Sequence, residues 1–197
     1  SMRDRFTEAI NQETARAARG EVAAIRAKLN SLVDEPIIKA LYRASAAGVT
    51  VDLNVRGICC LRPGVKGLSE NIRVVSIVDR FLEHSRIFYF HNGGEPNVFF
   101  ASADWMPRNL NRRVELLAPV EDPACRDRLV KILDVCLADN VKGHLLAADG
   151  SYQRLPADSN DVLSSQQRRY EWAVAQVKAA EQSKPTRFEP HRQPGNS

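Results

Sequence analysis

The chain has 197 residues, which is enough for one domain with a substantial hydrophobic core. Its hydrophobic fraction of 44% and charged fraction of 26% are ordinary for a globular domain and exclude a chain too polar to bury a core. The net charge of +4 favours anionic partners, but it is too small to distinguish nucleic acid, nucleotide and polyphosphate.

Cysteine usage and hydropathy indicate the cellular location of the protein. Four cysteines without a CxxC pair are neither a disulfide framework nor a zinc pattern, so we expect a cytoplasmic protein. No run of about 18 apolar residues is present, so we expect no integral membrane segment, with membrane association through a parent complex left open. Ser1-Met2 resembles a cloning remnant, and we expect a piece excised from a longer protein.

The first half of the chain alternates segments of helical and strand-like pattern. Asp34 with Pro36 in the next turn is typical of a helix start, and Gly48 of a helix end. The strand that follows ends at Arg56-Gly57, where α/β folds place ligands. The predicted elements are a helix over 3–19, a strand over 22–29, a helix over 34–48, a strand over 49–55, a loop over 57–70 and a helix over 72–82.

The second half continues the alternation, which predicts a layered α/β domain. Asp122-Pro123 opens an amphipathic helix, and Ser164 or Ser165 caps a final one. The predicted elements are strands over 86–90, 97–101 and 116–120, a helix over 123–138, a strand over 141–146, a loop over 147–163 and a last helix.

Polar side chains gather around the first two of these strands. His84 precedes the strand over 86–90, while Ser102 and Asp104 follow the strand over 97–101. If the two strands pair antiparallel through the Gly-Gly turn, these residues emerge at the same end of the sheet. Glu115 heads the next strand and could hydrogen-bond the His84 imidazole, which is the orienting role of an acid in nucleophile–His–acid sites.

Arginines are placed near the same end of the predicted sheet. Arg56, Arg108, Arg112 and Arg113 all follow or precede strands there. Guanidinium groups bind phosphate oxygens bidentately and neutralise charge that develops in phosphoryl transfer. The arginines and His84 together predict a site for phosphoryl chemistry.

Four stretches of the chain resemble one known family. They read AKLNSLVDEPIIKALYRASAAGV, LNVRGICCLRPGVKGLSENI, IVDRFLEHSRIFYFHNGG and SADWMPRNLNRRVELLAPV. In this order they resemble the C-terminal catalytic region of the phospholipase D-like polyphosphate kinases, over residues 5–155. The resemblance implies a phospholipase D-like half-domain over 21–155, built as a mixed sheet flanked by helices. We expect helical extensions at 1–20, as part of a linker, and at 156–182, and a disordered tail at 183–197.

The resemblance also implies roles for single residues. His84 matches the second, assisting histidine of these kinases, and Arg56 and Arg113 match the arginines that contact nucleotide phosphates. Ser102, Asp104 and Glu115 match the elements that follow the histidine in the superfamily. Arg86 stands where the superfamily's H-x-K motif has lysine, a departure shared by this half of the kinases.

The family's reaction implies partners outside this chain. ATP or ADP and inorganic polyphosphate are the implied substrates, with Mg²⁺ held by parts of the parent enzyme that are absent here. The histidine that becomes phosphorylated belongs to a missing half, so we expect this chain alone to be inactive. The parent is expected to be a homo-oligomer in which the remaining domains are the partners of this one, with no specific nucleic acid bound.

Two alternatives remain open on the sequence. A phosphodiesterase or nuclease of the phospholipase D superfamily would complete its site with His84 of two subunits, although the missing lysine counts against it. A non-enzymatic polyanion-binding module would use the arginines alone, although the modest net charge counts against that.

Overall fold

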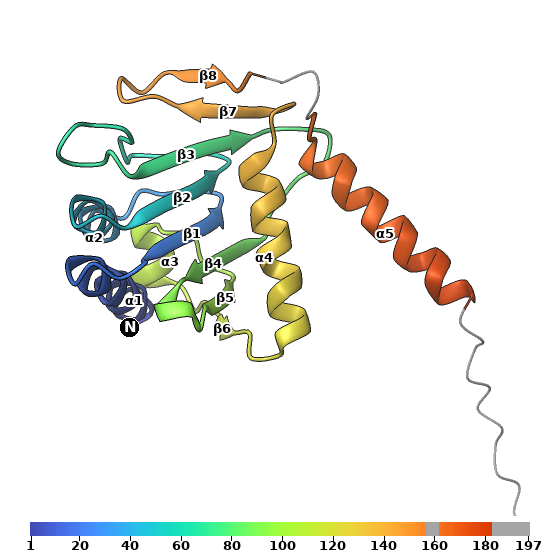
Figure 1. Ribbon diagram of the computed structural model, residues 1–197, viewed down its shortest axis with the longest axis horizontal. Helices are drawn as coiled ribbons and strands as arrows, with labels where there is room; N and C mark the ends of the chain where they lie inside the picture. Colours follow the sequence, from blue (N-terminus) through green and yellow to red (C-terminus); the bar gives the residue numbers. More distant parts are fainter. Residues whose placement is uncertain (157–161, 183–197) are drawn as a thin grey trace, which may run out of the picture.

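The computed structural model describes residues 1–156 and 162–182, and it consists of one eight-stranded mixed sheet with helices on both faces (Figure 1). The strand order is β6-β5-β4-β1-β2-β3-β7-β8. In chain order the elements are α1 (Met2–Ala18), β1 (Ala24–Leu29), α2 (Glu35–Ala46), β2 (Thr50–Val55), β3 (Ile72–Ile77), β4 (Arg86–Phe90), the 3₁₀ turn η1 (Asn92–Gly94), β5 (Asn97–Ala101), α3 (Pro107–Arg112), β6 (Leu117–Pro119), α4 (Pro123–Ala138), β7 (Gly143–Leu146), β8 (Tyr152–Arg154) and α5 (Ser165–Gln182). The predicted α/β class, a mixed sheet flanked by helices, is confirmed. The tail expected at 183–197 lies outside the described residues.

The strand directions bring the ends of several strands together on one side of the sheet. β1, β2 and β3 are parallel, whereas β4 is antiparallel to β1 and to β5. Lys28 is opposite Ile87, and Arg86 is opposite Ala101. The carboxyl ends of β1, β2, β3 and β5 and the amino end of β4 therefore lie together. We call this border of the sheet, formed by strand ends and not by an outer strand, the site edge. The predicted antiparallel pairing of 86–90 with 97–101 is confirmed.

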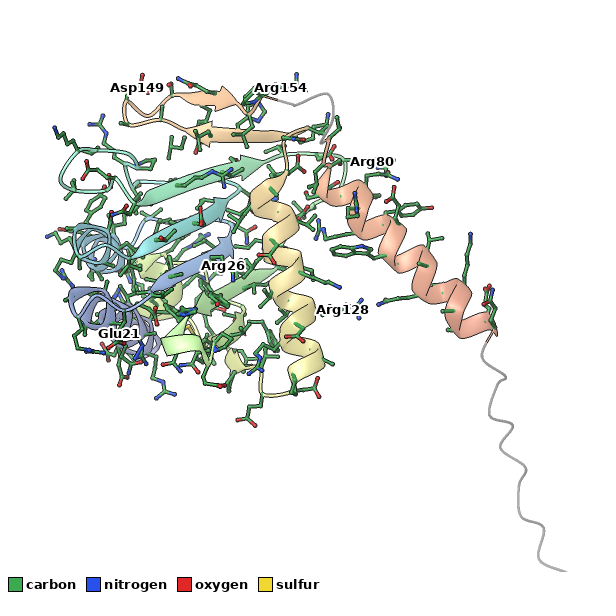
Figure 2. The ribbon with its side chains drawn as sticks, viewed as in Figure 1. Glu21, Arg26, Arg80, Arg128, Asp149 and Arg154 are labelled. Carbon is green, nitrogen blue, oxygen red and sulfur yellow. The ribbon has the colours of Figure 1, made fainter. Side chains whose placement is uncertain are left out.

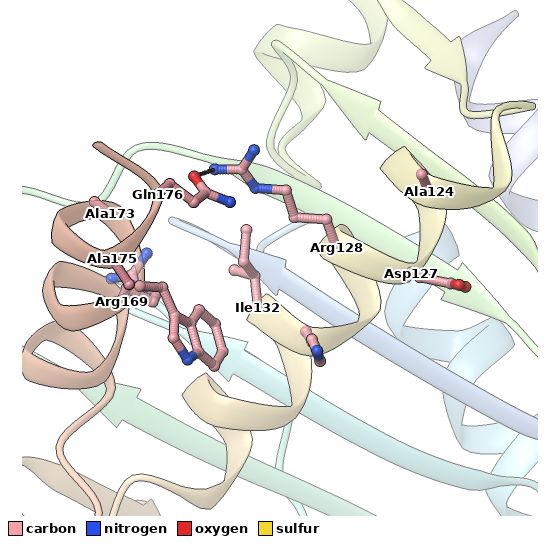
Figure 3. A pocket seen from close by; sticks show the side chains of 10 residues that line it. Ala124, Asp127, Arg128, Ile132, Arg169, Ala173, Ala175 and Gln176 are labelled. Atoms are coloured by element: carbon pink, nitrogen blue, oxygen red, sulfur yellow. Dashed lines mark hydrogen bonds between the residues drawn. The ribbon is translucent and has the colours of Figure 1, made fainter. Parts of the chain in front are cut away.

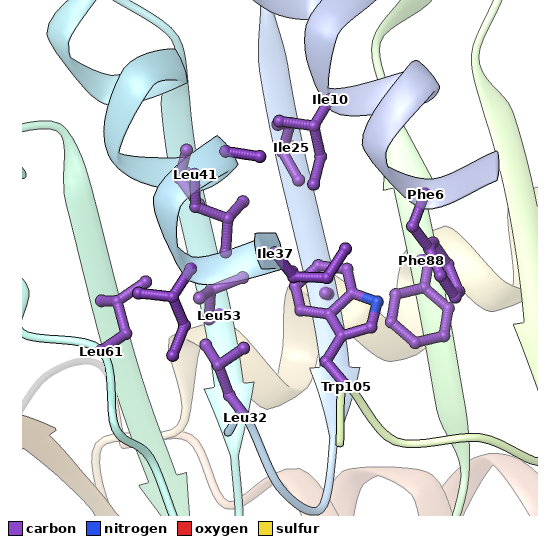
Figure 4. Packing of buried hydrophobic residues seen from close by; sticks show 14 of the residues in the cluster. Phe6, Ile10, Ile25, Leu32, Ile37, Leu41, Leu53, Leu61, Phe88 and Trp105 are labelled. Atoms are coloured by element: carbon purple, nitrogen blue, oxygen red, sulfur yellow. The ribbon is translucent and has the colours of Figure 1, made fainter. Parts of the chain in front are cut away.

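One face of the sheet is covered by α1 and α2, and the larger core lies there (Figures 1 and 4). Phe6 of α1 meets Phe88 of β4 with ring centroids 4.6 Å apart, and Phe88 meets Trp105 at 5.0 Å. Ile10, one helical turn after Phe6, is completely buried. We expected residues 1–20 to be part of a linker, but these contacts make α1 a component of the same core as the sheet.

The other face is covered by α4. Leu133 and Cys136 of this helix are buried against the sheet. Arg26 of β1 lies on this side as well, where it pairs with Asp134 and places its guanidinium 4.1 Å from the centre of the Tyr89 ring (Figure 2). The polar part of this interface also includes Arg73 of β3, whose Nη1 donates to the carbonyl of Leu137 in α4 at 3.0 Å.

Local signals in the sequence explain where α2 begins. The Asp34 carboxylate accepts a hydrogen bond from the backbone N–H of Ile37 at 3.3 Å, and Pro36 stands in the first turn. Arg3 of α1 adds a second contact, with its Nη2 at 2.7 Å from Asp34 Oδ2. The predicted cap is confirmed, and it also joins α1 to α2.

Two predicted elements are wrong. The helix expected over 72–82 is the strand β3, which lies between β2 and β7 and is buried on both faces. A strand buried on both faces shows no polar alternation, so the periodicity of this segment does not distinguish it from a buried helix. The loop expected over 147–163 contains β8, whose residues are all exposed and therefore carry no apolar pattern.

Both outer strands of the sheet are short. β6 and β8 each have three residues, and β6 ends at Pro119. None of the helices within the described ranges, 1–156 and 162–182, is long and apolar enough to cross a membrane.

Candidate functional site

Asp104 is the centre of a hydrogen-bond network at the site edge. Its Oδ1 accepts from the backbone N–H groups of Asn30 at 2.7 Å and Ser31 at 3.3 Å, both just beyond the end of β1. The Arg86 guanidinium binds the same carboxylate twice, from Nε to Oδ1 at 3.2 Å and from Nη2 to Oδ2 at 2.9 Å. The carboxylate thus ties the end of β1 to the start of β4.

Arg86 carries this network to His84. Its Nη1 lies 3.0 Å from Nδ1 of His84, and its Nη2 lies 3.3 Å from Nε2. The two nitrogens of an imidazole point in diverging directions, so one planar guanidinium reaches both only by lying over the face of the ring. Nη1 also donates to the carbonyl of His84 at 3.0 Å. Arg86 therefore fixes both the ring and the backbone of the exposed His84.

Asn30 extends the network to Arg56. The Asn30 side chain donates to Asp104 at 3.3 Å and accepts from Arg56 Nε at 3.1 Å. Gly57 follows, and its N–H donates to the Asn30 carbonyl at 2.8 Å. A Cβ at Gly57 would lie 2.9 Å from that carbonyl oxygen, so glycine permits the close approach. One continuous chain of contacts therefore joins Arg56 to His84.

Glu115 contacts other partners than the one we expected. Its carboxylate accepts from the hydroxyl of Ser102 and from Asn109 Nδ2 at 2.6 Å. Ser102 Oγ in turn accepts from the N–H of Leu116 at 2.8 Å. Glu115 thus joins the end of β5 to α3 and to the start of β6. In this structure the side chain that contacts the His84 ring is Arg86.

The predicted arginines differ in how firmly they are held. Arg56 is half-buried and hydrogen-bonded, whereas Arg108, Arg112 and Arg113 are exposed on and after α3. Within the described residues, none of the four has a carboxylate at ion-pair distance, in contrast to Arg86, which is paired with Asp104. Their positive charge is consequently available to an anionic ligand.

The two carboxylates of the site are held in their charged forms. Burial acts to raise the pKa of Asp104, but the hydrogen bonds from Arg86 and from the Asn30 and Ser31 amides outweigh it and leave the pKa below its ordinary value. The hydroxyl of Ser102 is the main cause that lowers the pKa of Glu115, with burial opposing it and Asn109 adding to it. Both groups therefore serve as acceptors near neutral pH.

The same contacts decide whether this part of the chain suits a metal ion. The oxygens of Asp104 are taken by Arg86 and backbone amides, and those of Glu115 by Ser102 and Asn109. Across the described residues, no group of three or more His, Cys, Asp or Glu side chains is placed to hold a metal. The side chains of the site therefore do not fit Mg²⁺.

Reasoning on the sequence missed part of this site. It treated Arg86 only as a departure from a motif, and it gave Asn30 no definite role. The signal for Arg86 was its position at the start of a strand, two residues after His84, because side chains two apart along extended backbone point to the same side. Asn30 could have been found from its place directly after β1, beside β2, which Arg56 directly follows.

Comparison with known proteins finds a matching family model and relatives of high sequence identity. The model of the family "Polyphosphate kinase C-terminal domain 2" matches residues 1–166. A polyphosphate kinase of Rhodopirellula baltica is 51% identical over 193 residues, which is 98% of this chain and 23% of the relative. One of Synechocystis sp. is 56% identical over 167 residues, or 84% of this chain and 23% of the relative.

A solved structure agrees with the sequence relatives. The crystal structure of polyphosphate kinase from Porphyromonas gingivalis superimposes with a TM-score of 0.86 at 40% identity, covering 90% of this chain and 27% of that one. The chain therefore spans about a quarter of the length of each of these proteins.

Proposed function

The chain belongs to the polyphosphate kinase family, and from this we propose that the enzyme containing it transfers the γ-phosphate of ATP reversibly to inorganic polyphosphate. The chain would supply one side of the active site. The transfer would pass through a phosphohistidine in a part of the enzyme outside this chain, because a labile P–N bond splits one difficult step into two easier ones.

His84 is the residue that we assign to the reacting phosphoryl group. It is exposed at the site edge, while Arg86 holds its ring. It would donate a proton to the leaving oxygen or stabilise the charged intermediate. Because Arg86 and Asp104 are buried, the ring is presented from a rigid base rather than from a mobile loop.

Arg56 and Arg113 are the proposed phosphate clamps, and Arg108 adds positive charge beside them. The observation that carries the proposal is that a continuous chain of contacts joins Arg56 to His84, and that among the described residues these arginines have no carboxylate partner. Ser102 and Glu115 would hold Arg113 in place through the start of β6. Losing such a charge-stabilising contact commonly costs on the order of 10²–10³ in rate.

Substitution in the full-length enzyme tests this function. We expect His84→Ala, Arg56→Ala and Arg113→Ala to reduce polyphosphate synthesis from ATP by about 10²-fold or more. His91→Ala and Arg43→Ala are the matched controls, because His91 lies at the opposite end of β4 and Arg43 is exposed on α2. Full activity of the His84→Ala enzyme would exclude the assignment.

The isolated chain offers a second test. We expect it to make no polyphosphate from ATP, because the phosphorylated histidine would be elsewhere. Synthesis at the rate of the full-length enzyme would show that the whole site lies in this chain. Hydrolysis of a chromogenic phosphodiester that depends on His84 would instead favour a phosphodiesterase built from two subunits.

A further inference from the structure

A second polar cluster holds the segment that carries His84, and it comes from α5. The carboxylate of Glu83 is nearly buried and has three partners. Lys28 Nζ lies 3.2 Å from its Oε2, Gln166 Nε2 donates to its Oε1 at 3.0 Å, and Arg169 pairs with the same oxygen. The residue directly before His84 is therefore bound to both β1 and α5.

The same side chains also bind the backbone on either side of His84. Gln166 accepts from the Phe81 N–H at 2.9 Å and donates to the Phe81 carbonyl at 2.8 Å, so its amide pairs with this residue as a neighbouring strand would. Lys28 reaches the carbonyl of Ser85 at 3.4 Å. Residues 81, 83 and 85 are thus all held.

The first turn of α5 is itself anchored. Asp139, at the end of α4, accepts from the Ser165 N–H at 2.7 Å and from the N–H groups of Val141 and Lys142 at 3.0 and 2.8 Å. Gln166 is 5% exposed, in contrast to Gln167 next to it, which is exposed. Gln166 and Arg169, which we call the clamp, therefore stand on a fixed support.

The rest of α5 contacts α4, where Arg128 Nη2 donates to Gln176 Oε1 at 3.1 Å. The helix runs away from the sheet (Figure 1), and a cavity of about 540 Å³ lies between it and α4, lined in part by Ile132 and Ala173 (Figure 3). The contacts of α5 with the sheet side are therefore concentrated in Gln166 and Arg169.

Stability alone is a poor explanation for this cluster. Removing Glu83, Lys28 and Arg169 from water costs free energy, which ion pairing at best roughly recovers, so buried ionic groups are weak evidence for stabilisation. Such groups fix one geometry, because each needs its partners in place. What this cluster fixes is the segment on both sides of His84.

We propose that Gln166 and Arg169 are positioning residues that set the His84 side chain for phosphoryl transfer. The inference rests on the proposed function for the role of His84 itself. Gln166 is the last residue that the family model matches, and Arg169 lies one helical turn beyond it on α5.

Adjacent residues of α5 provide matched controls. In the full-length enzyme, Gln166→Ala and Arg169→Ala are compared with Gln167→Ala and Arg168→Ala, whose side chains are exposed and do not contact the clamp. We expect kcat, measured per folded enzyme, to fall by about 10- to 100-fold in the clamp variants, because small misplacement of a reacting group is costly. The KM for ATP should stay within about twofold, since the proposed phosphate-binding residues Arg56 and Arg113 are untouched. Arg169→Lys should recover part of kcat by keeping the pair with Glu83.

A second readout does not depend on activity. Hydrogen exchange of the peptide covering 79–86 should accelerate in both clamp variants and remain at the wild-type rate in both controls. Unchanged exchange, or a kcat equal to that of the controls, would overturn the inference. If His84→Ala retained activity, the proposed function would fail, and the exchange result would still decide whether α5 holds this segment.

Discussion

Arg86 and Asp104 form a pair in which each side chain is only 9% exposed, and Arg86 Nη2 lies 2.9 Å from Asp104 Oδ2. The same guanidinium lies over the ring of His84. One buried pair thus contributes to the packing of the site edge and to the orientation of its exposed histidine, so a change in Asp104 is expected to alter both.

Replacing Asp104 with alanine should destabilise the fold. It leaves the buried Arg86 without its carboxylate, and breaking such a pair typically costs about 3–5 kcal/mol. Equilibrium urea unfolding of the chain measures the loss. Glu70→Ala, at an exposed position, should change the free energy of unfolding by no more than about 0.5 kcal/mol. Equal stability of the two variants would show that the pair contributes nothing.

Acid should remove the contribution of Asp104 to the free energy of unfolding. Because its pKa in the folded state is below the ordinary value of 3.8, the unfolded chain binds the proton more readily, and stability rises with pH. The contribution is complete above about pH 5 and is lost as the pH falls through the folded pKa. We expect the difference in unfolding free energy between wild type and Asp104→Asn to be constant from pH 7 to about pH 5 and to shrink in more acidic buffer. A difference that grows on acidification would contradict this sign.

Glu115→Gln should act on binding more than on the chemical step. Glu115 contacts Ser102 and Asn109, and through them the segment that carries Arg113. We expect the KM for ATP in the full-length enzyme to rise several-fold while kcat changes less. Steady-state kinetics separate the two effects. The opposite result, a lower kcat at constant KM, would support the expectation that Glu115 orients His84.

Phe6→Ala should destabilise the domain strongly. Phe6 is 1% exposed and contacts Phe88 and Trp105, so truncation leaves a cavity that typically costs about 3–5 kcal/mol. Thermal unfolding should show a large drop in Tm, whereas Asn11→Ala, exposed on the same helix, should not. Similar Tm values for the two variants would mean that α1 contributes little to the stability of the domain.

Much of the fold follows from local signals. The β4 and β5 strands occupy the predicted residues, because their apolar runs are bounded by a polar segment and a Gly-Gly turn. The helix starts at Asp34 and Asp122 were readable because a carboxylate N-cap needs no tertiary information. β3 was missed because burial on both faces depends on its neighbours β2 and β7, which lie elsewhere in the chain.

The candidate site, too, was predictable from the sequence only in part. Strand pairing was enough to bring His84, Ser102 and Asp104 to one edge. The choice of partner was not predictable, because Glu115 and Arg86 both lie within reach of this edge and only packing decides between them. The clamp from Gln166 and Arg169 joins residues more than eighty positions apart, and no sequence pattern marks such a contact.

The short outer strands have a consequence for how the protein behaves in concentrated solution. An unpaired strand can recruit another chain through its free N–H and C=O groups, which leads to aggregation. β6 and β8 offer only three residues each, Pro119 has no N–H to donate, and Arg154 adds charge at the other border. Copies of this sheet therefore have little backbone through which to join edge to edge, even though the buried strands between them are strongly apolar.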